Sequence, residues 1–91
     1  GEQAILTALK VDLQISTSAM DTYLGQLITA PGLYIREGIT LTESVEDGML
    51  VEMYAAYLYR RRREENVQMP RMLRWALNNR LFSQKARGPD G

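Results

Sequence analysis

Apolar residues recur every three or four positions along most of the chain, which is the period of an amphipathic helix. Ser18 and Ser44 are each followed three residues later by an aspartate, an arrangement typical of helix N-caps. The pattern predicts about four helices, at residues 2–11, 18–37, 45–64 and 70–83. The sequence therefore predicts an all-α fold, a small bundle that forms a single domain over residues 1–91.

Proline and glycine refine the boundaries of these helices. Pro31 lies inside the second helix, where a proline removes a backbone hydrogen bond and costs ~3 kcal/mol, so we expect a break there. Gly38 suits the position just after a helix end, and Pro70 suits the first position of the last helix. The chain is polar from Ser83 and ends in Gly-Pro-Asp-Gly, so we expect residues 84–91 to form a mobile tail.

The third helix carries apolar residues on more than one face, which indicates burial on two sides. These residues are Val45, Met49, Leu50, Val51, Met53, Tyr54, Tyr57 and Leu58. We expect Tyr54 and Tyr57 to lie in the core. Trp75 is also expected to be a core anchor, because no other exposed aromatic residues flank it as they would in a base-stacking site.

Charge is divided sharply along the chain, although the total is zero. Residues 1–57 contain two basic and eight acidic residues, a net charge of −6. Residues 58–91 contain nine basic and three acidic residues, a net charge of +6. Such segregation suits contacts between copies of the chain, or guidance of a polyanion along one side.

The residue types exclude several functional classes. The chain has no histidine and no cysteine, so it lacks the usual general base, the thiolate nucleophile and the commonest metal ligands. The acidic pairs Glu46/Asp47 and Glu64/Glu65 lie near predicted helix ends, where capping and solvation explain them. We therefore expect no enzyme, cofactor or metal. No apolar run approaches the ~20 residues of a membrane span, so we expect a soluble intracellular protein or part of a particle assembled inside a cell.

Four consecutive arginines, Arg60–Arg63, end the third helix. Four successive helical residues spread over about 300° around the axis, so these side chains cannot all face one partner. Two interpretations stay open: a solvated helix end paired with Glu52, Glu64 or Glu65, or a contact with another subunit or a nucleic acid. The candidates for an interface are Tyr59, Arg60, Arg61, Arg62, Arg63, Arg71 and Arg74.

The order of several segments resembles a known family. These segments are Leu9-Lys-Val-Asp-Leu13, Asp21-Thr-Tyr-Leu24, Asp47-Gly-Met-Leu-Val-Glu-Met-Tyr-Ala-Ala-Tyr-Leu-Tyr-Arg-Arg-Arg63, Met69-Pro-Arg-Met-Leu-Arg74 and Ala76-Leu-Asn-Asn79. Over roughly residues 5–85 the chain is similar to the small head–tail connector proteins of long-tailed bacteriophages and prophages, also called adaptor or head-completion proteins. The tyrosine–arginine helix and the Met-Pro-Arg-Met-Leu-Arg segment carry most of the likeness.

This resemblance implies an all-helical structural protein of the virion head–tail junction, assembled in the cytoplasm of a bacterial host. Its partners would be copies of itself in a ring, the portal protein above, and tail-side connector proteins below, with at most passing contact with duplex DNA. Overall neutrality agrees, because tight DNA wrapping needs many uncompensated cations. The alternatives are a small helical DNA-binding regulator, supported by the basic fourth helix, or a generic helical interaction module.

Overall fold

The protein is all-α in a computed structural model that describes residues 1–29 and 32–87. In these residues the order of elements is α1 (Glu2–Leu13), α2 (Asp21–Thr29), α3 (Gly32–Ile35), α4 (Val45–Arg63) and α5 (Arg71–Arg87). The predicted all-α class is confirmed, with four longer helices and the single turn α3. The molecule is flat, with principal extents of 43 × 30 × 19 Å.

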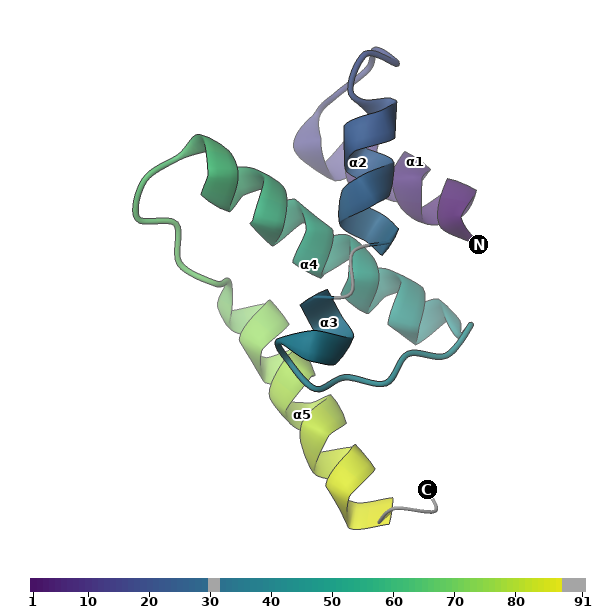
Figure 1. Cartoon of the computed structure of the whole chain (residues 1–91), viewed down its shortest axis with the longest axis vertical. Coiled ribbons are helices and arrows are strands. Elements are labelled where there is room, and N and C mark those ends of the chain that lie inside the picture. Colours follow the sequence, from purple (N-terminus) through teal and green to yellow (C-terminus); the bar gives the residue numbers. More distant parts are fainter. Residues whose placement is uncertain (30–31, 88–91) are drawn as a thin grey trace.

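The long helix α4 is the centre of the fold. In Figure 1 it crosses the middle of the molecule, with α1 and α2 above it and α3 and α5 below it. Leu9 of α1 and Leu24 of α2 pack on Ala55 and Ala56 of α4 to form one buried cluster. A second cluster joins α4 to α3, α5 and the segment after α3; its buried members are Leu33, Ile39, Leu50, Val51, Tyr54, Leu58, Leu73 and Leu77. The predicted burial of the third helix on two sides is therefore confirmed.

Both predicted features at the ends of α3 and α4 are present. Gly38 has φ +73° just after α3, and Ile39 N–H donates to the carbonyl of Leu33, which closes the helix end. Ser44 caps α4, because its hydroxyl accepts from the N–H of Asp47. These two ends fix the direction of the irregular segment between them.

Several predicted boundaries were wrong. The first helix continues to Leu13 instead of ending at residue 11. The second begins at Asp21 rather than at Ser18, whose backbone carbonyl instead accepts from Asp21 N–H in the preceding turn. The predicted break at Pro31 lies outside the described residues.

The last helix is longer than predicted. It begins at Arg71 and extends to Arg87, four residues beyond the predicted end. The expected mobile tail is therefore wrong for residues 84–87, and residues 88–91 lie outside the described part. The physical reason is Gln84, whose side chain forms hydrogen bonds with the backbone of Gly38 and Thr40 and so ties this last part of α5 to the fold.

Candidate interaction surfaces

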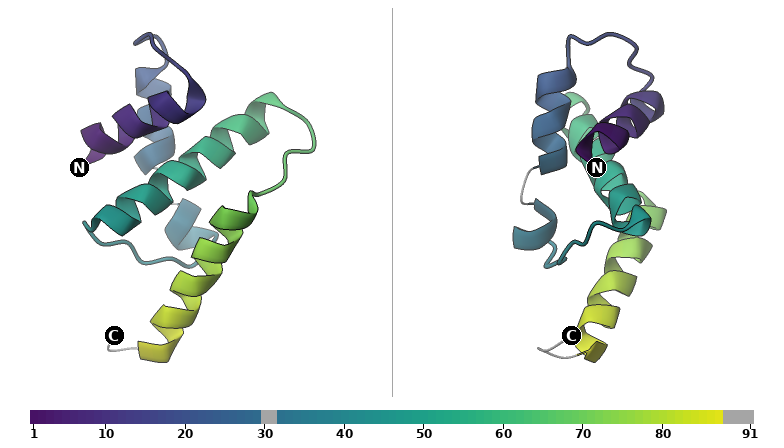
Figure 2. Two further views of the ribbon diagram at one scale, coloured as in Figure 1. Left: turned by 180° about the vertical axis from the view of Figure 1, so that it is seen from behind. Right: turned by 90° about the vertical axis from the view of Figure 1, so that its right-hand side faces the viewer.

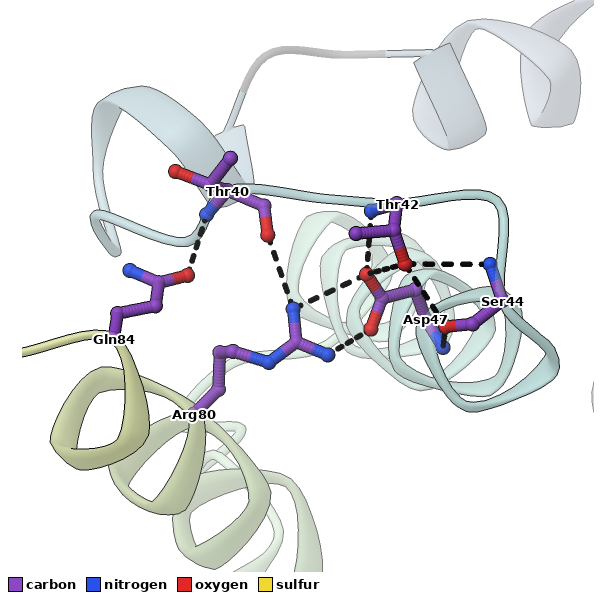
Figure 3. Close-up of polar contacts among 6 residues, drawn as sticks. All are labelled: Thr40, Thr42, Ser44, Asp47, Arg80 and Gln84. Atoms are coloured by element: carbon purple, nitrogen blue, oxygen red, sulfur yellow. Dashed lines mark hydrogen bonds and ion pairs between the residues drawn. The ribbon is translucent and has the colours of Figure 1, made fainter. Parts of the chain in front are cut away.

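The most enclosed polar site in residues 1–29 and 32–87 is centred on Asp47 and holds the fold together. Asp47 is 1% exposed, and its carboxylate accepts from the N–H of Thr42 at 2.6 Å and from the Thr42 hydroxyl at 3.0 Å. Arg80 of α5 donates to both carboxylate oxygens of Asp47 and, at 3.0 Å, to the carbonyl of Thr40 (Figure 3). The predicted role of Asp47 as a solvated capping residue is therefore only half right: it joins α4 to α5 and to the segment between α3 and α4.

The electrostatics of this pair follow from its surroundings. Burial pushes the pKa of Asp47 upward, but the hydrogen bonds from Arg80 and Thr42 outweigh it and leave the pKa below its usual value. The same contact raises the pKa of Arg80. Arg80 was not among the predicted site residues. The sequence feature that could have identified Arg80 is its spacing. It lies seven residues after Leu73 and three after Leu77, which places it on the buried face of α5.

A second cluster of charged groups lies between α1 and α4, and it is partly exposed to solvent. Arg60 contacts the Asp12 carboxylate at 3.3 Å, and Glu52 lies against the same carboxylate, with one of its oxygens buried. Burial and the neighbouring Asp12 raise the pKa of Glu52 to about 7, against the opposing effect of Arg60. Glu52 is thus partly protonated near neutral pH, and in that form its hydroxyl can donate to Asp12.

The four arginines at the end of α4 have different surroundings, as the helical geometry requires. Arg60 forms the ion pair with Asp12. The other three guanidinium groups lie over tyrosine rings: Arg61 over Tyr57 at 5.2 Å, Arg62 over Tyr23 at 6.0 Å and Arg63 over Tyr59 at 4.5 Å. In residues 1–29 and 32–87, none of the four arginines forms an ion pair with Glu52, Glu64 or Glu65. The ion pairs that the interpretation as a solvated helix end predicted are therefore wrong.

The remaining predicted interface residues do not form one site. Tyr59 is half-buried and packs against Tyr23 at 6.4 Å between ring centroids. Arg71 and Arg74 are exposed on α5, and Arg74 pairs loosely with Glu37 at 3.7 Å. Arg61, Arg62, Arg63 and Arg71 are therefore exposed without an ion pair to a described residue, whereas Arg60 and Arg74 form ion pairs within the chain.

An apolar face of α5 points away from the core. Met72, Trp75 and Phe82 are 76%, 68% and 77% exposed, and together with Asn79 they lie within about 80° around the helix axis, at 100° per residue. We call these four residues the α5 stripe. Trp75 lies two positions from both Leu73 and Leu77, about 200° around the axis from each, so the stripe is opposite the buried face. The expectation that Trp75 is a core anchor is therefore wrong.

A groove of about 560 Å³ lies between the start of α1, the start of α4 and the segment before α4. We call it the α1–α4 groove. Its floor is apolar and includes Ile5, Ala8 and Ile28, and the exposed side chains of Leu41, Val45 and Met49 stand around it. Glu2 and Glu43 also line it. Exposed apolar side chains within an acidic surround are typical of a surface that binds another macromolecule.

Residues 1–29 and 32–87 contain no group of three or more carboxylates placed to hold a metal ion. None of the described helices has both the length and the apolar character needed to cross a membrane. No family model, curated protein or solved structure matches the chain.

Proposed function

We propose that this protein is a head–tail connector of a long-tailed bacteriophage or prophage, a structural subunit that forms a ring beneath the portal of the filled capsid. In this role the ring extends the DNA channel and offers a docking surface to tail-side proteins. The proposal begins from the resemblance of residues 5–85 to such connectors. The observation that carries it further is the pair of unpartnered apolar surfaces, the α5 stripe and the α1–α4 groove.

The α5 stripe also bears on the alternative, a DNA-binding regulator. A helix that enters the major groove presents polar and basic side chains to base edges and phosphates. In α5 the most exposed face instead carries Met72, Trp75 and Phe82, with basic residues along one side of it. This arrangement favours a protein partner over duplex DNA.

Solution mass and DNA binding together test the proposal. We expect sedimentation analysis to show assembly beyond a dimer as the concentration rises from about 10 µM to about 1 mM, a range that covers weak association. We expect a fluorescent random-sequence duplex to bind weakly, with little change between 50 and 200 mM salt, because a connector must let DNA slide. A monomer or dimer at every concentration, combined with duplex binding that falls steeply with salt, would establish the regulator instead.

A further inference from the structure

We propose that copies of this chain associate head to tail, with the α5 stripe of one copy seated in the α1–α4 groove of the next. This inference rests on the proposed function in that it takes self-association as given, and it specifies which surfaces meet. The partner of each surface is thus a second copy of the chain.

Charge complementarity is the first argument for this occupant. Arg71, Asn78 and Lys85 follow one another at seven-residue intervals and so run beside the α5 stripe on one side, within about 60° of it. The groove has Glu2 and Glu43 in its lining and the exposed Glu46 on the same turn of α4 as Val45. No lysine or arginine side chain is among the described residues that line the groove. A basic-edged apolar stripe therefore meets an acidic apolar groove.

The same charges disfavour the two alternative arrangements, in which like surfaces of two copies meet. If two copies paired stripe to stripe about a two-fold axis, Arg71 and Lys85 of both copies would share one interface without an acidic partner on either α5 stripe. Two grooves placed face to face would likewise bring Glu2 and Glu43 of both copies together. Only the heterologous contact brings opposite charges together, and a heterologous contact closes into a ring when the rotation allows.

The positions of the two surfaces permit this contact in every copy at once. The starts of α1 and α4 lie together at one edge of the molecule, on the right in Figure 1. The helix α5 packs below α4. The side chains of the α5 stripe are exposed and therefore face away from that core. The two views in Figure 2 agree that α5 extends away from α1 on the far side of α4. One copy can therefore bind a neighbour through each surface at the same time.

The size of the contact predicts its strength. If each of Met72, Trp75 and Phe82 buries about 150 Å², the α5 stripe contributes roughly 450 Å², and both sides together about 900 Å². Specific interfaces smaller than about 1,200 Å² are characteristically weak and transient. We therefore expect association only at high protein concentration.

The experiment uses two complementary variants and the only tryptophan of the chain, which lies in the α5 stripe. Met49→Arg puts a basic side chain in the groove and leaves the α5 stripe intact. Trp75→Asp puts an acidic side chain in the α5 stripe and leaves the groove intact. Both positions are exposed, at 61% and 68%, so we expect both variants to fold, as circular dichroism would verify. Tyr34→Asp, at a position 68% exposed on α3, is the matched control.

We expect the parent and the Tyr34→Asp variant to associate as concentration rises, with a blue shift of the Trp75 emission as its ring leaves water. Each interface variant alone should stay monomeric, and Met49→Arg should keep the red emission of an exposed tryptophan. An equimolar mixture should form heterodimers and no larger species, because one intact stripe meets one intact groove. Its emission should shift to the blue, a signal that comes only from Met49→Arg.

Cysteine pairs provide a second measurement, because the chain has no native cysteine. Met49→Cys and Trp75→Cys, mixed under oxidising conditions at high concentration, should give the mixed disulfide in preference to either like pair. Predominant 75–75 disulfides, or variants that assemble like the parent, would overturn the head-to-tail docking while leaving the connector function standing. A parent that stays monomeric at about 1 mM, together with cysteine variants that form no mixed disulfide at that concentration, would overturn both.

Discussion

At the scale of single residues, the contact between Asp47 and Arg80 decides how α5 is attached. Asp47 is 1% exposed and is fully hydrogen-bonded by Thr42 and Arg80. A buried carboxylate that loses its cationic partner leaves an uncompensated charge, which is typically destabilising by about 3–5 kcal/mol. The lowered pKa of Asp47 also makes the stability depend on pH. The ionised carboxylate stabilises the fold above the ordinary pKa of aspartate, and this stabilisation is lost as the pH falls through the lowered pKa of Asp47.

We expect Arg80→Met, which keeps the apolar stem of the side chain, to lower the free energy of unfolding by about 3 kcal/mol. The melting temperature should fall by about 12–24 °C for a domain of this size. Arg74→Met is the control, because Arg74 is exposed and only loosely paired with Glu37, so its effect should stay within about 0.5 kcal/mol. Urea denaturation and thermal melting measure both, and equal losses in the two variants would contradict the assigned role of Arg80.

Glu52 gives the fold a dependence on pH near neutrality. Its pKa is raised to about 7 in the folded state, so its contribution is fully present below its ordinary pKa and is lost as pH rises through about 7. We expect the free energy of unfolding to decrease by about 1–2 kcal/mol between pH 5 and pH 8, after allowance for solvent screening of this partly exposed group. In Glu52→Gln the amide donates to Asp12 at every pH, so this decrease should disappear. Glu65→Gln, at an exposed position, should keep it; a pH profile unchanged by Glu52→Gln would refute the assignment.

At the scale of elements, α4 and α5 show how much the sequence determines. The apolar positions of α4 cover so much of its circumference that two-sided burial follows from periodicity alone. In α5 two apolar stripes, one with Leu73 and Leu77 and one with Trp75, are both plausible inward faces. Periodicity gives the angle between two stripes but not which of them a neighbouring element covers, and so the prediction for Trp75 failed.

Some of the candidate interaction surfaces could likewise be predicted from the sequence, and others could not. The arginines of α4 could be named from the sequence because they are consecutive, and their dispersal around the axis follows from helix geometry. The α1–α4 groove could not be predicted, because it brings residues near position 5 beside residues near position 45 through tertiary packing. The extension of α5 past Ser83 also depends on a tertiary contact, the hydrogen bonds between Gln84 and the backbone near Gly38.

Two glycines of the second and third elements should respond oppositely to the same change. A Cβ at Gly32 would lie 2.9 Å from the ring of Tyr54, which is buried and cannot easily move, so Gly32→Ala should destabilise the fold by about 1–3 kcal/mol. A Cβ at Gly25 would meet nothing within 4 Å inside α2, so Gly25→Ala should stabilise it by about 0.5–1 kcal/mol. Urea denaturation gives both values. If Gly32→Ala were as stable as the parent, the close approach of α3 to Tyr54 would be wrong.

At the scale of the whole molecule, the division of charge along the chain has two uses. Three of the four ion pairs in residues 1–29 and 32–87 join a basic residue of the second half to an acidic residue of the first: Arg60–Asp12, Arg74–Glu37 and Arg80–Asp47. Part of this division of charge therefore holds the fold of the single chain together. The exposed remainder, with Glu2 and Glu43 at the groove and Arg71 and Lys85 beside the α5 stripe, is what the proposed contact between copies would use.

The central position of α4 also determines how the protein unfolds. Each hydrophobic cluster uses α4 as one of its walls, so neither half of the chain can complete a cluster without it. If α4 leaves one hydrophobic cluster it also leaves the other, so we expect the two clusters to unfold together as a single cooperative unit. We therefore expect the backbone amides in the middle of α4 to exchange their hydrogens with water only through global unfolding, whereas the exposed ends of the helices can exchange through local fraying.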